Sequence, residues 1–151
     1  MLIYFRIVVI SDDGSMMSVA LNACVLALLD AGLPMFYVPN SVCFSVAQDK
    51  SIYLDPSTKE EESAIASLLF TLNPSTIKNT CAIVVSEFAY NGGNNSNSDY
   101  NAKFDALSED FLLQTMDDAV KTSLALNDQI RRIVKSRLEL SEPGGDQVWK
   151  K

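Results

Sequence analysis

The alternation of apolar and polar residues along the chain predicts both strands and helices. Residues 2–10 are almost continuously apolar and rich in Ile, Val, Tyr and Phe, which favours a strand buried on both faces. Residues 16–31 carry Ala, Leu and Met at helical density, and Gly32 and Pro34 follow them as a helix stop. Ser15 precedes this segment and is a suitable N-cap. Because the segment is apolar nearly all round, we expect a helix in the centre of the fold.

A hairpin and two further strands are expected in the middle of the chain. Residues 40–47 and 51–54 have strand character, and the polar residues 48–50 between them suit a hairpin turn. Residues 68–72 and 80–88 are typical of two more strands, with an Asn-Pro-Ser turn between them.

Two more helices complete the expected set of elements. A short one over residues 59–66 would hold three glutamates in its first turn, where negative charge is favourable. From residue 105 to 138 apolar side chains recur at near-helical spacing, which predicts one long amphipathic helix. The whole pattern predicts an α/β or α+β domain over residues 1–140, in which helices cover a mixed sheet. Residues 91–99 are expected to be a polar loop, and residues 141–151 a flexible tail.

Composition limits the class of protein. A chain of 151 residues with 48% apolar residues is the size of one ordinary globular domain. The longest apolar run is broken by Asn22 and closed by Asp30, so it is too short to span a bilayer. Cys24, Cys43 and Cys81 lie in apolar stretches without paired spacing, as reduced thiols of intracellular proteins do. We therefore expect a cytosolic or nuclear protein with neither a signal peptide nor a membrane segment.

The complete absence of histidine restricts the possible chemistry. It removes every triad that uses His and the usual zinc sites, so catalysis would rest on carboxylates, hydroxyls, thiols or cations. Two stretches qualify by composition. The turn at Asp12, Asp13 and Gly14 precedes a helix start, where phosphates bind, but no basic residue follows it. The run of one Lys and three Glu over residues 59–62 could bind a metal, but neighbouring positions on a helix point in different directions.

Electrostatics bear on nucleic-acid binding in two ways. A net charge of −7 disfavours nonspecific binding of nucleic acid by the whole surface. Four cations nevertheless cluster near the end of the long helix, namely Arg131, Arg132, Lys135 and Arg137. They either offset the negative end of the helix dipole or hold an RNA backbone or an acidic partner, and the first interpretation is the simpler one.

Several of these stretches together are similar to a known family. They are Asp13-Gly14-Ser15, the helix end with its stop over residues 27–35, and Leu54-Asp55-Pro56. With the order of the expected elements, they resemble the RNase PH-like subunits of the RNA exosome over about residues 8–137. The resemblance implies an RNase PH-like domain that lacks the first strands of the family's domain, because only its C-terminal part is covered.

The resemblance also implies a degenerate catalytic site. Phosphorolytic members hold the attacking phosphate with a Thr-Arg or similar pair at the start of the helix, and Met16 and Met17 occupy those positions. Ser63 and Leu68 fall where those members place catalytic or metal-binding acids. Asp55 is a weak catalytic candidate, because an Asp before Pro is more often a turn former. No cofactor or metal is expected.

The function implied is that of a noncatalytic ring subunit, which supports assembly and RNA threading in 3′-5′ RNA processing and decay, including rRNA processing. Its partners would be other RNase PH-like exosome subunits, cap subunits and, weakly, RNA through the four cations, with no membrane involved. The expected location is nucleus, nucleolus and cytoplasm. The alternative is a phosphorolytic or metal-dependent exoribonuclease with rearranged acidic residues, using Asp55 and the glutamate run.

Overall fold

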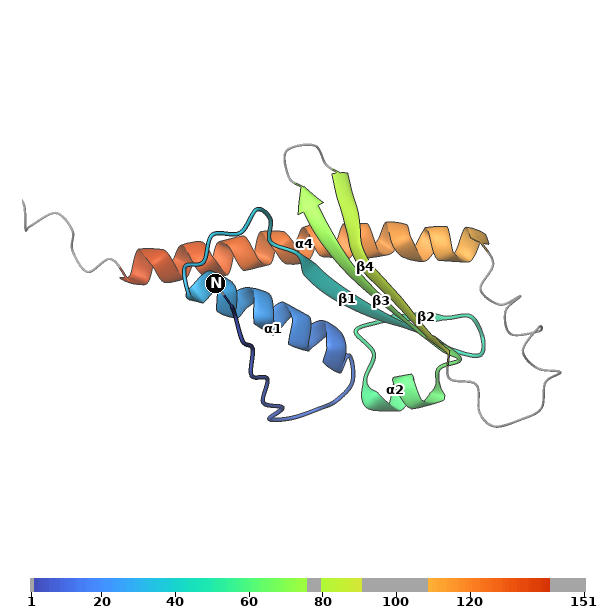
Figure 1. Ribbon diagram of the computed structural model, residues 1–151. Coiled ribbons are helices and arrows are strands. Elements are labelled where there is room, and N and C mark those ends of the chain that lie inside the picture. The colour runs from blue at the N-terminus through green and yellow to red at the C-terminus, as the bar shows by residue number, and fades with distance from the viewer. Residues whose placement is uncertain (1, 76–79, 91–108, 142–151) are drawn as a thin grey trace, which may run out of the picture.

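The fold is built on a four-stranded antiparallel sheet (Figure 1). The computed structural model describes residues 2–75, 80–90 and 109–141. Its elements in chain order are helix α1 (Met16–Asp30), strands β1 (Asn40–Val46) and β2 (Ile52–Leu54), helix α2 (Thr58–Ser63), strands β3 (Ala66–Ser75) and β4 (Thr80–Tyr90), and helix α4 (Glu109–Ser141). The strand order is β2-β1-β3-β4 and every neighbouring pair is antiparallel. The α+β class is confirmed, whereas the expected mixed sheet is wrong for the described strands.

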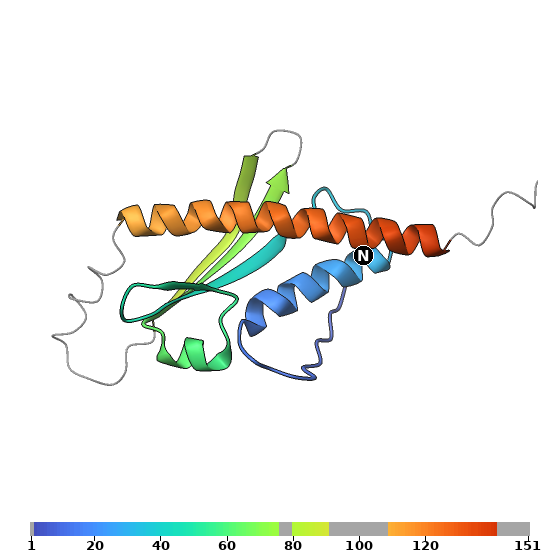
Figure 2. The same ribbon diagram turned by 180° about the vertical axis from the view of Figure 1, so that it is seen from behind.

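Helix α4 crosses one face of the sheet and covers the core (Figures 1 and 2). The register pairs Val42 with Phe70 and Phe44 with Leu68, so alternate residues of β1 and β3 present one apolar face. The rings of Phe44 and Phe70 meet edge to face with centroids 6.1 Å apart. The buried core cluster consists of Val42, Phe44, Val46, Ala66, Leu68, Phe70, Leu72 and Ala119.

The buried side of α4 is made mostly of small and polar residues, which lets the helix approach the sheet closely. Its buried positions recur every three or four residues, as a helix face requires: Thr115, Ala119, Ser123, Asn127 and Ile130. Asn40 at the start of β1 provides the polar link. Its amide Nδ2 donates to the Ser123 carbonyl at 3.0 Å, and the Ser123 hydroxyl donates to Asn40 Oδ1 at 2.5 Å. Buried polar groups of helix and sheet thus satisfy each other.

Helix α1 lies along the side of β1 that β2 leaves uncovered. Strand β2 pairs only with the last three residues of β1, residues 44–46. Near the start of β1, the Asn22 side chain donates a hydrogen bond from Nδ2 to the Ser41 carbonyl at 2.8 Å. Its Oδ1 accepts a hydrogen bond from the Ser41 N–H at 2.7 Å. The side-chain amide therefore takes the place of a neighbouring strand and satisfies both backbone groups of Ser41.

Three expectations from the sequence need correction. Residues 2–10 form no strand, because their backbone makes no hydrogen bonds with any of the described strands. Helix α1 is not central, since Ser18 is its only buried residue, and it touches the sheet mainly along β1. Helix α2 ends at Ser63 instead of residue 66, because the Ile65 N–H donates to the Val46 carbonyl at 2.8 Å and draws the chain into the sheet.

The remaining expected elements, apart from one turn, agree with the structure where it describes them. The hairpin of β1 and β2, the strands β3 and β4 and the long helix α4 are confirmed. The expected turn over Asn73-Pro74-Ser75 is wrong, because these three residues continue β3 and pair with the first residues of β4. The predicted loop at residues 91–99, the helix start at 105–108 and the tail from residue 142 lie outside the described residues. None of the helices in the described part of the chain is both long and apolar enough to cross a membrane.

Candidate functional site

The start of α1 rests directly on the chain that leads into α2. Gly14 has φ +98°, and a Cβ at this position would lie 2.3 Å from the Pro56 carbonyl oxygen. Such a contact is possible only for glycine. The two segments are then joined by two hydrogen bonds: the Thr58 N–H donates to the Asp13 carbonyl at 3.0 Å, and the Ser15 hydroxyl donates to the Pro56 carbonyl at 3.2 Å.

A carboxylate from α2 occupies the position where an anion would meet the start of α1. The Ser15 N–H donates to Glu61 Oε1 at 2.8 Å, and Ser15 is only 2% exposed. The start of a helix attracts negative charge because its N–H groups and its dipole point outward. Glu61 supplies that charge from within the protein, so it competes with an external phosphate at this place.

Ser15 occupies the expected N-cap position, but its side chain does not cap the helix. Ser15 adopts a left-handed conformation with φ 52°, and its hydroxyl makes no capping hydrogen bond to the helix. Its Oγ donates to the Pro56 carbonyl instead. The cause is the close contact at Gly14, which turns the chain so that Ser15 faces the segment before α2.

The four positions that the resemblance implies to be degenerate lie on three separate elements. Met16 and Met17 lie in the first turn of α1 and are about half exposed, at 51% and 54%. Ser63 ends α2, where its hydroxyl donates to the Glu60 carbonyl at 3.2 Å. Leu68 is fully buried in the core beneath α4. A carboxylate at position 68 would therefore lie in apolar surroundings.

The glutamates of α2 have separate contacts. Glu60 accepts hydrogen bonds at Oε2 from the Ser57 N–H and the Ser57 hydroxyl, both at 2.8 Å. The N-cap residue of α2 is thus bonded to the third residue of the helix. These hydrogen bonds lower the pKa of the Glu60 carboxyl. Glu61 turns toward Ser15, while Glu62 is exposed.

Asp55 lies in a tight turn after β2. It has φ 54° and is exposed, and its N–H donates to the Cys43 carbonyl at 2.9 Å. Cys43 itself is half-buried on β1. Burial raises the pKa of its thiol to about 11, and the nearby Glu61 carboxylate adds to the increase. At neutral pH this thiol is protonated and is a poor nucleophile.

A cavity of about 670 Å³ joins the turn before α1 to the segment before α2. Four carboxylate residues line it, namely Asp12, Asp13, Asp55 and Glu60. Its described lining contains no Lys or Arg. Among the residues that the structure describes, no group of three or more His, Cys, Asp or Glu side chains is arranged to hold a metal ion. The cavity is acidic, and phosphate would be repelled from it.

The four cations of α4 do not form one patch. Arg131 and Arg132 lie four and three residues before Lys135, so these three cations share one side of the helix. Arg132 pairs with Asp128 at 2.5 Å and Lys135 with Glu139 at 3.9 Å, so acidic neighbours offset part of this charge. Arg137 lies two positions beyond Lys135, on the side of α4 that lines a groove with α1.

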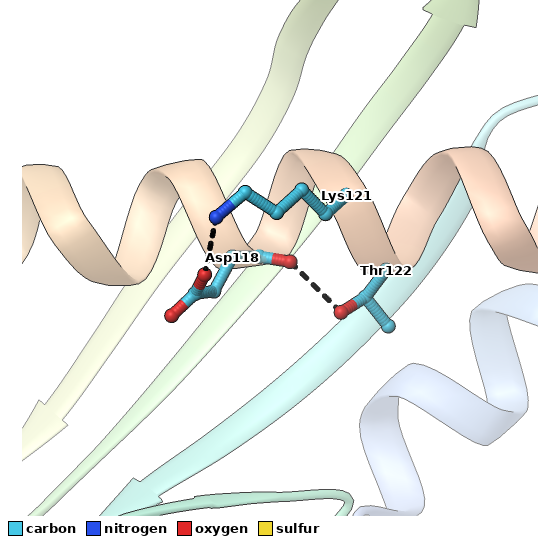
Figure 3. A network of polar contacts seen from close by, with 3 residues as sticks. All are labelled: Asp118, Lys121 and Thr122. Atoms are coloured by element: carbon cyan, nitrogen blue, oxygen red, sulfur yellow. Dashed lines mark hydrogen bonds and ion pairs between the residues drawn. The ribbon is translucent and has the colours of Figure 1, made fainter.

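Similar local pairs occur earlier on the exposed side of α4 (Figure 3). Lys121 Nζ donates to Asp118 Oδ1 at 2.9 Å, and the Thr122 hydroxyl donates to the Asp118 carbonyl at 2.8 Å. The hydrogen bond to Asp118 raises the pKa of Lys121. Such exposed pairs contribute little to stability, and they leave this side of the helix with charges of both signs.

Part of the chain is similar in sequence to known proteins. No protein-family model matches it. A 64-residue stretch is 41% identical to the exosome complex exonuclease RRP46 homolog of Arabidopsis thaliana, covering 41% of this chain and 27% of that protein. A 63-residue stretch is 40% identical to the exosome complex component RRP46 homolog of Caenorhabditis elegans, covering 42% and 29%. These stretches of the chain are similar to RRP46 exosome proteins. The resemblance to exosome subunits expected from the sequence is confirmed.

A solved structure shares the fold of this chain. The crystal structure of the C. elegans cell-death-related nuclease 5 superposes with a TM-score of 0.64 and 24% identity, over 86% of this chain and 61% of that one. This superposition shows the fold alone. The aligned stretches span less than a third of the RRP46 relatives' own length, at 27% and 29%.

Two contacts of the site could not be predicted from the sequence. The hydrogen bond from Ser15 to Glu61 joins residues 46 positions apart, and Asn22 bonds Ser41 across 19 positions. The first has a partial signal, since Glu61 lies in a run of glutamates. The second has none beyond a polar residue in an apolar helix.

The contact at Gly14 leads to a stability prediction. Replacing Gly14 by Ala should lower the free energy of unfolding by at least about 2 kcal/mol, because the new methyl group meets the Pro56 carbonyl at a positive φ. Gly32→Ala is the matched control, since Gly32 also has positive φ (+66°) but nothing lies within 4 Å of its Cβ position. That control should cost only about 1 kcal/mol. Urea unfolding of both variants measures the difference, and equal losses would show that the contact with Pro56 is not tight.

Proposed function

We propose that this chain is a noncatalytic, RNase PH-like ring subunit of the RNA exosome, which supports assembly and RNA threading in 3′-5′ RNA processing and decay. The observation that carries the proposal is its identity of about 40% to RRP46 exosome proteins over the matched stretches. Its proposed partners are other RNase PH-like subunits, cap subunits and RNA. The proposed locations are nucleus, nucleolus and cytoplasm.

The residues at the start of α1 support the proposal that the chain is noncatalytic. Met16 and Met17 provide no charge for a phosphate, and the Glu61 carboxylate already accepts the Ser15 N–H. Phosphoryl chemistry depends on positive charge or donors aimed at the anion. The cavity in front of α1 has four carboxylate residues and no cation in its described lining.

A second candidate function is favoured by the names of two similar proteins. The Arabidopsis protein is called an exonuclease, and the superposed C. elegans structure is called a nuclease. In this alternative, Asp55 and the α2 glutamates would serve a phosphorolytic or metal-dependent exoribonuclease. Asp55 and Glu60 do line the same cavity, which is the feature that such a mechanism would use.

We predict that the purified chain releases no nucleoside diphosphates from single-stranded RNA in the presence of phosphate, because no described cation faces the α1 start. Chromatography of the reaction products is the measurement. An activity that survives purification and disappears in the Asp55→Asn variant would establish the alternative function. Activity that is the same in wild type and variant would come from a contaminating enzyme.

The assembly role predicts that the chain associates with exosome subunits in cells. Helix α1 exposes Met16, Met17, Val19 and Leu26, and an apolar surface of this kind is normally covered by a partner. Affinity purification of the tagged chain followed by mass spectrometry should recover RNase PH-like and cap subunits. A Val19→Asp/Leu26→Asp variant should recover at least about tenfold less. The control is Leu113→Asp, which changes an equally exposed residue of α4. Recovery of no exosome subunit would refute the proposed role.

The three cations on one side of α4 predict a weak, salt-sensitive contact with RNA. Replacing Arg131 and Arg132 by Glu should reduce RNA retention by the assembled ring at low salt and change little at high salt, since each phosphate neutralised on a single strand contributes about 0.7 to the salt slope. Filter binding over a salt series measures this. Arg137→Glu is the control, because Arg137 lies on the groove side of the helix. If the double variant loses ring assembly instead of RNA, the pair belongs to a protein interface.

A further inference from the structure

The side of α4 that faces the sheet repeats itself every four residues. Its buried middle row consists of Thr115, Ala119, Ser123 and Asn127, none of them more than 2% exposed. Apolar residues flank this row at the same spacing: Leu112, Met116, Val120 and Leu124 on one side, and Leu126, Ile130 and Val134 on the other. If the helix slid by four residues, about 6 Å, toward its own N-terminus, each position in these rows would receive a residue of a similar kind. Side-chain packing therefore distinguishes poorly between the two registers.

The link between Asn40 and Ser123 does distinguish between the registers. Both side chains are buried, at 1% and 0% exposed. The Asn40 amide N–H needs only a helix carbonyl, which every turn of α4 offers, but Asn40 Oδ1 accepts the Ser123 hydroxyl at 2.5 Å. After a slide of one turn toward the N-terminus, the larger Asn127 would replace Ser123, and after a slide the other way Ala119 would leave Oδ1 without a donor. Because a buried acceptor without a donor is unfavourable, the Ser123 hydroxyl selects the observed register.

The register of α4 decides where its cations lie. The end of the helix continues past the sheet to the end of α1 (Figures 1 and 2), where Ile133 lines a groove between the two helices. A slide of one turn toward the N-terminus would bring Arg131 to the buried place of Asn127, and Arg137 to the place of Ile133. A long Arg side chain can still extend to solvent from such places. The second register is therefore accessible, but in it the cations leave the positions that they occupy in the structure.

We propose that the buried pair of Asn40 and Ser123 fixes the register of α4, which its repeated side would otherwise leave free to change by one turn. Asn40 is then a positioning residue for the cations near the end of the helix, although it touches none of them. One-turn shifts of a packed helix are a known kind of conformational change between two discrete states. The inference concerns the helix itself and does not depend on the proposed exosome role.

A distance measurement by pulsed electron paramagnetic resonance tests the register directly. Spin-labelled amino acids are incorporated at position 62 in α2 and position 136 in α4, which are exposed, so the three native cysteines stay unchanged. Figures 1 and 2 both show α2 beside the first half of α4, and residue 136 lies near the other end. A slide toward the N-terminus therefore shortens the distance by up to about 6 Å. The wild-type chain should give one distance.

Two variants should populate the second register. Asn40→Ala removes both hydrogen bonds to Ser123, so we expect the shorter distance in at least about 10% of the molecules. Asn127→Ser provides the same hydroxyl one turn farther along, so that both registers offer Asn40 a donor and two distances are expected again. Thr115→Ala is the matched control. Thr115 is also fully buried, but its hydroxyl donates to the Phe111 carbonyl within the helix at 2.9 Å, so a single distance should remain.

The outcomes decide the inference separately from the proposed function. A single, unchanged distance in either folded variant, Asn40→Ala or Asn127→Ser, would overturn the inference, and so would a shorter distance in Thr115→Ala. Circular dichroism shows whether each variant is folded. If Asn40→Ala does not fold, Asn127→Ser alone decides, because it keeps Asn40 and replaces a buried side chain by a smaller one. Recovery of exosome subunits from cells is a separate measurement, so either result can fail while the other stands.

Discussion

The close contact between Gly14 and the Pro56 carbonyl sets the position of everything around it. It fixes where α1 begins, and the Glu61 carboxylate then accepts the Ser15 N–H next to it. Because a helix is rigid, its start also fixes Asn22, which follows about two turns later. Asn22 in turn completes the uncovered side of β1 at Ser41. The sheet edge therefore depends on a contact made by a residue without a side chain.

The sequence predicts the elements of the fold well where local pattern decides them. The hairpin of β1 and β2 and the long helix α4 follow from periods of two and of about 3.6 residues, and the structure has them within a few residues. Burial is a different matter. An apolar composition predicts that residues 2–10 and α1 are central, yet both lie at the surface, because burial depends on tertiary packing and not on composition alone.

The candidate site also has features that follow from local sequence and features that depend on tertiary structure. The absence of charge at Met16 and Met17 can be read from the sequence, since it concerns only the identity of two residues. The contact between Glu61 and Ser15 is not visible, because it is made by the tertiary structure across 46 positions. The cations of α4 form one cluster in the sequence, but the helix period separates Arg137 from Arg131, Arg132 and Lys135.

The surroundings of Leu68 disfavour an acid at this position. The family resemblance puts an acid near this position, but Leu68 is fully buried among apolar core residues under α4. Burying a carboxylate without a partner costs several kcal/mol, a large part of the roughly 5–15 kcal/mol by which a domain of this size is typically stable. The Glu61 carboxylate also accepts the Ser15 N–H at the start of α1, so an anion there would meet a negative charge. A catalytic site of the kind that the resemblance implies would therefore require changes in α2 as well as in β3.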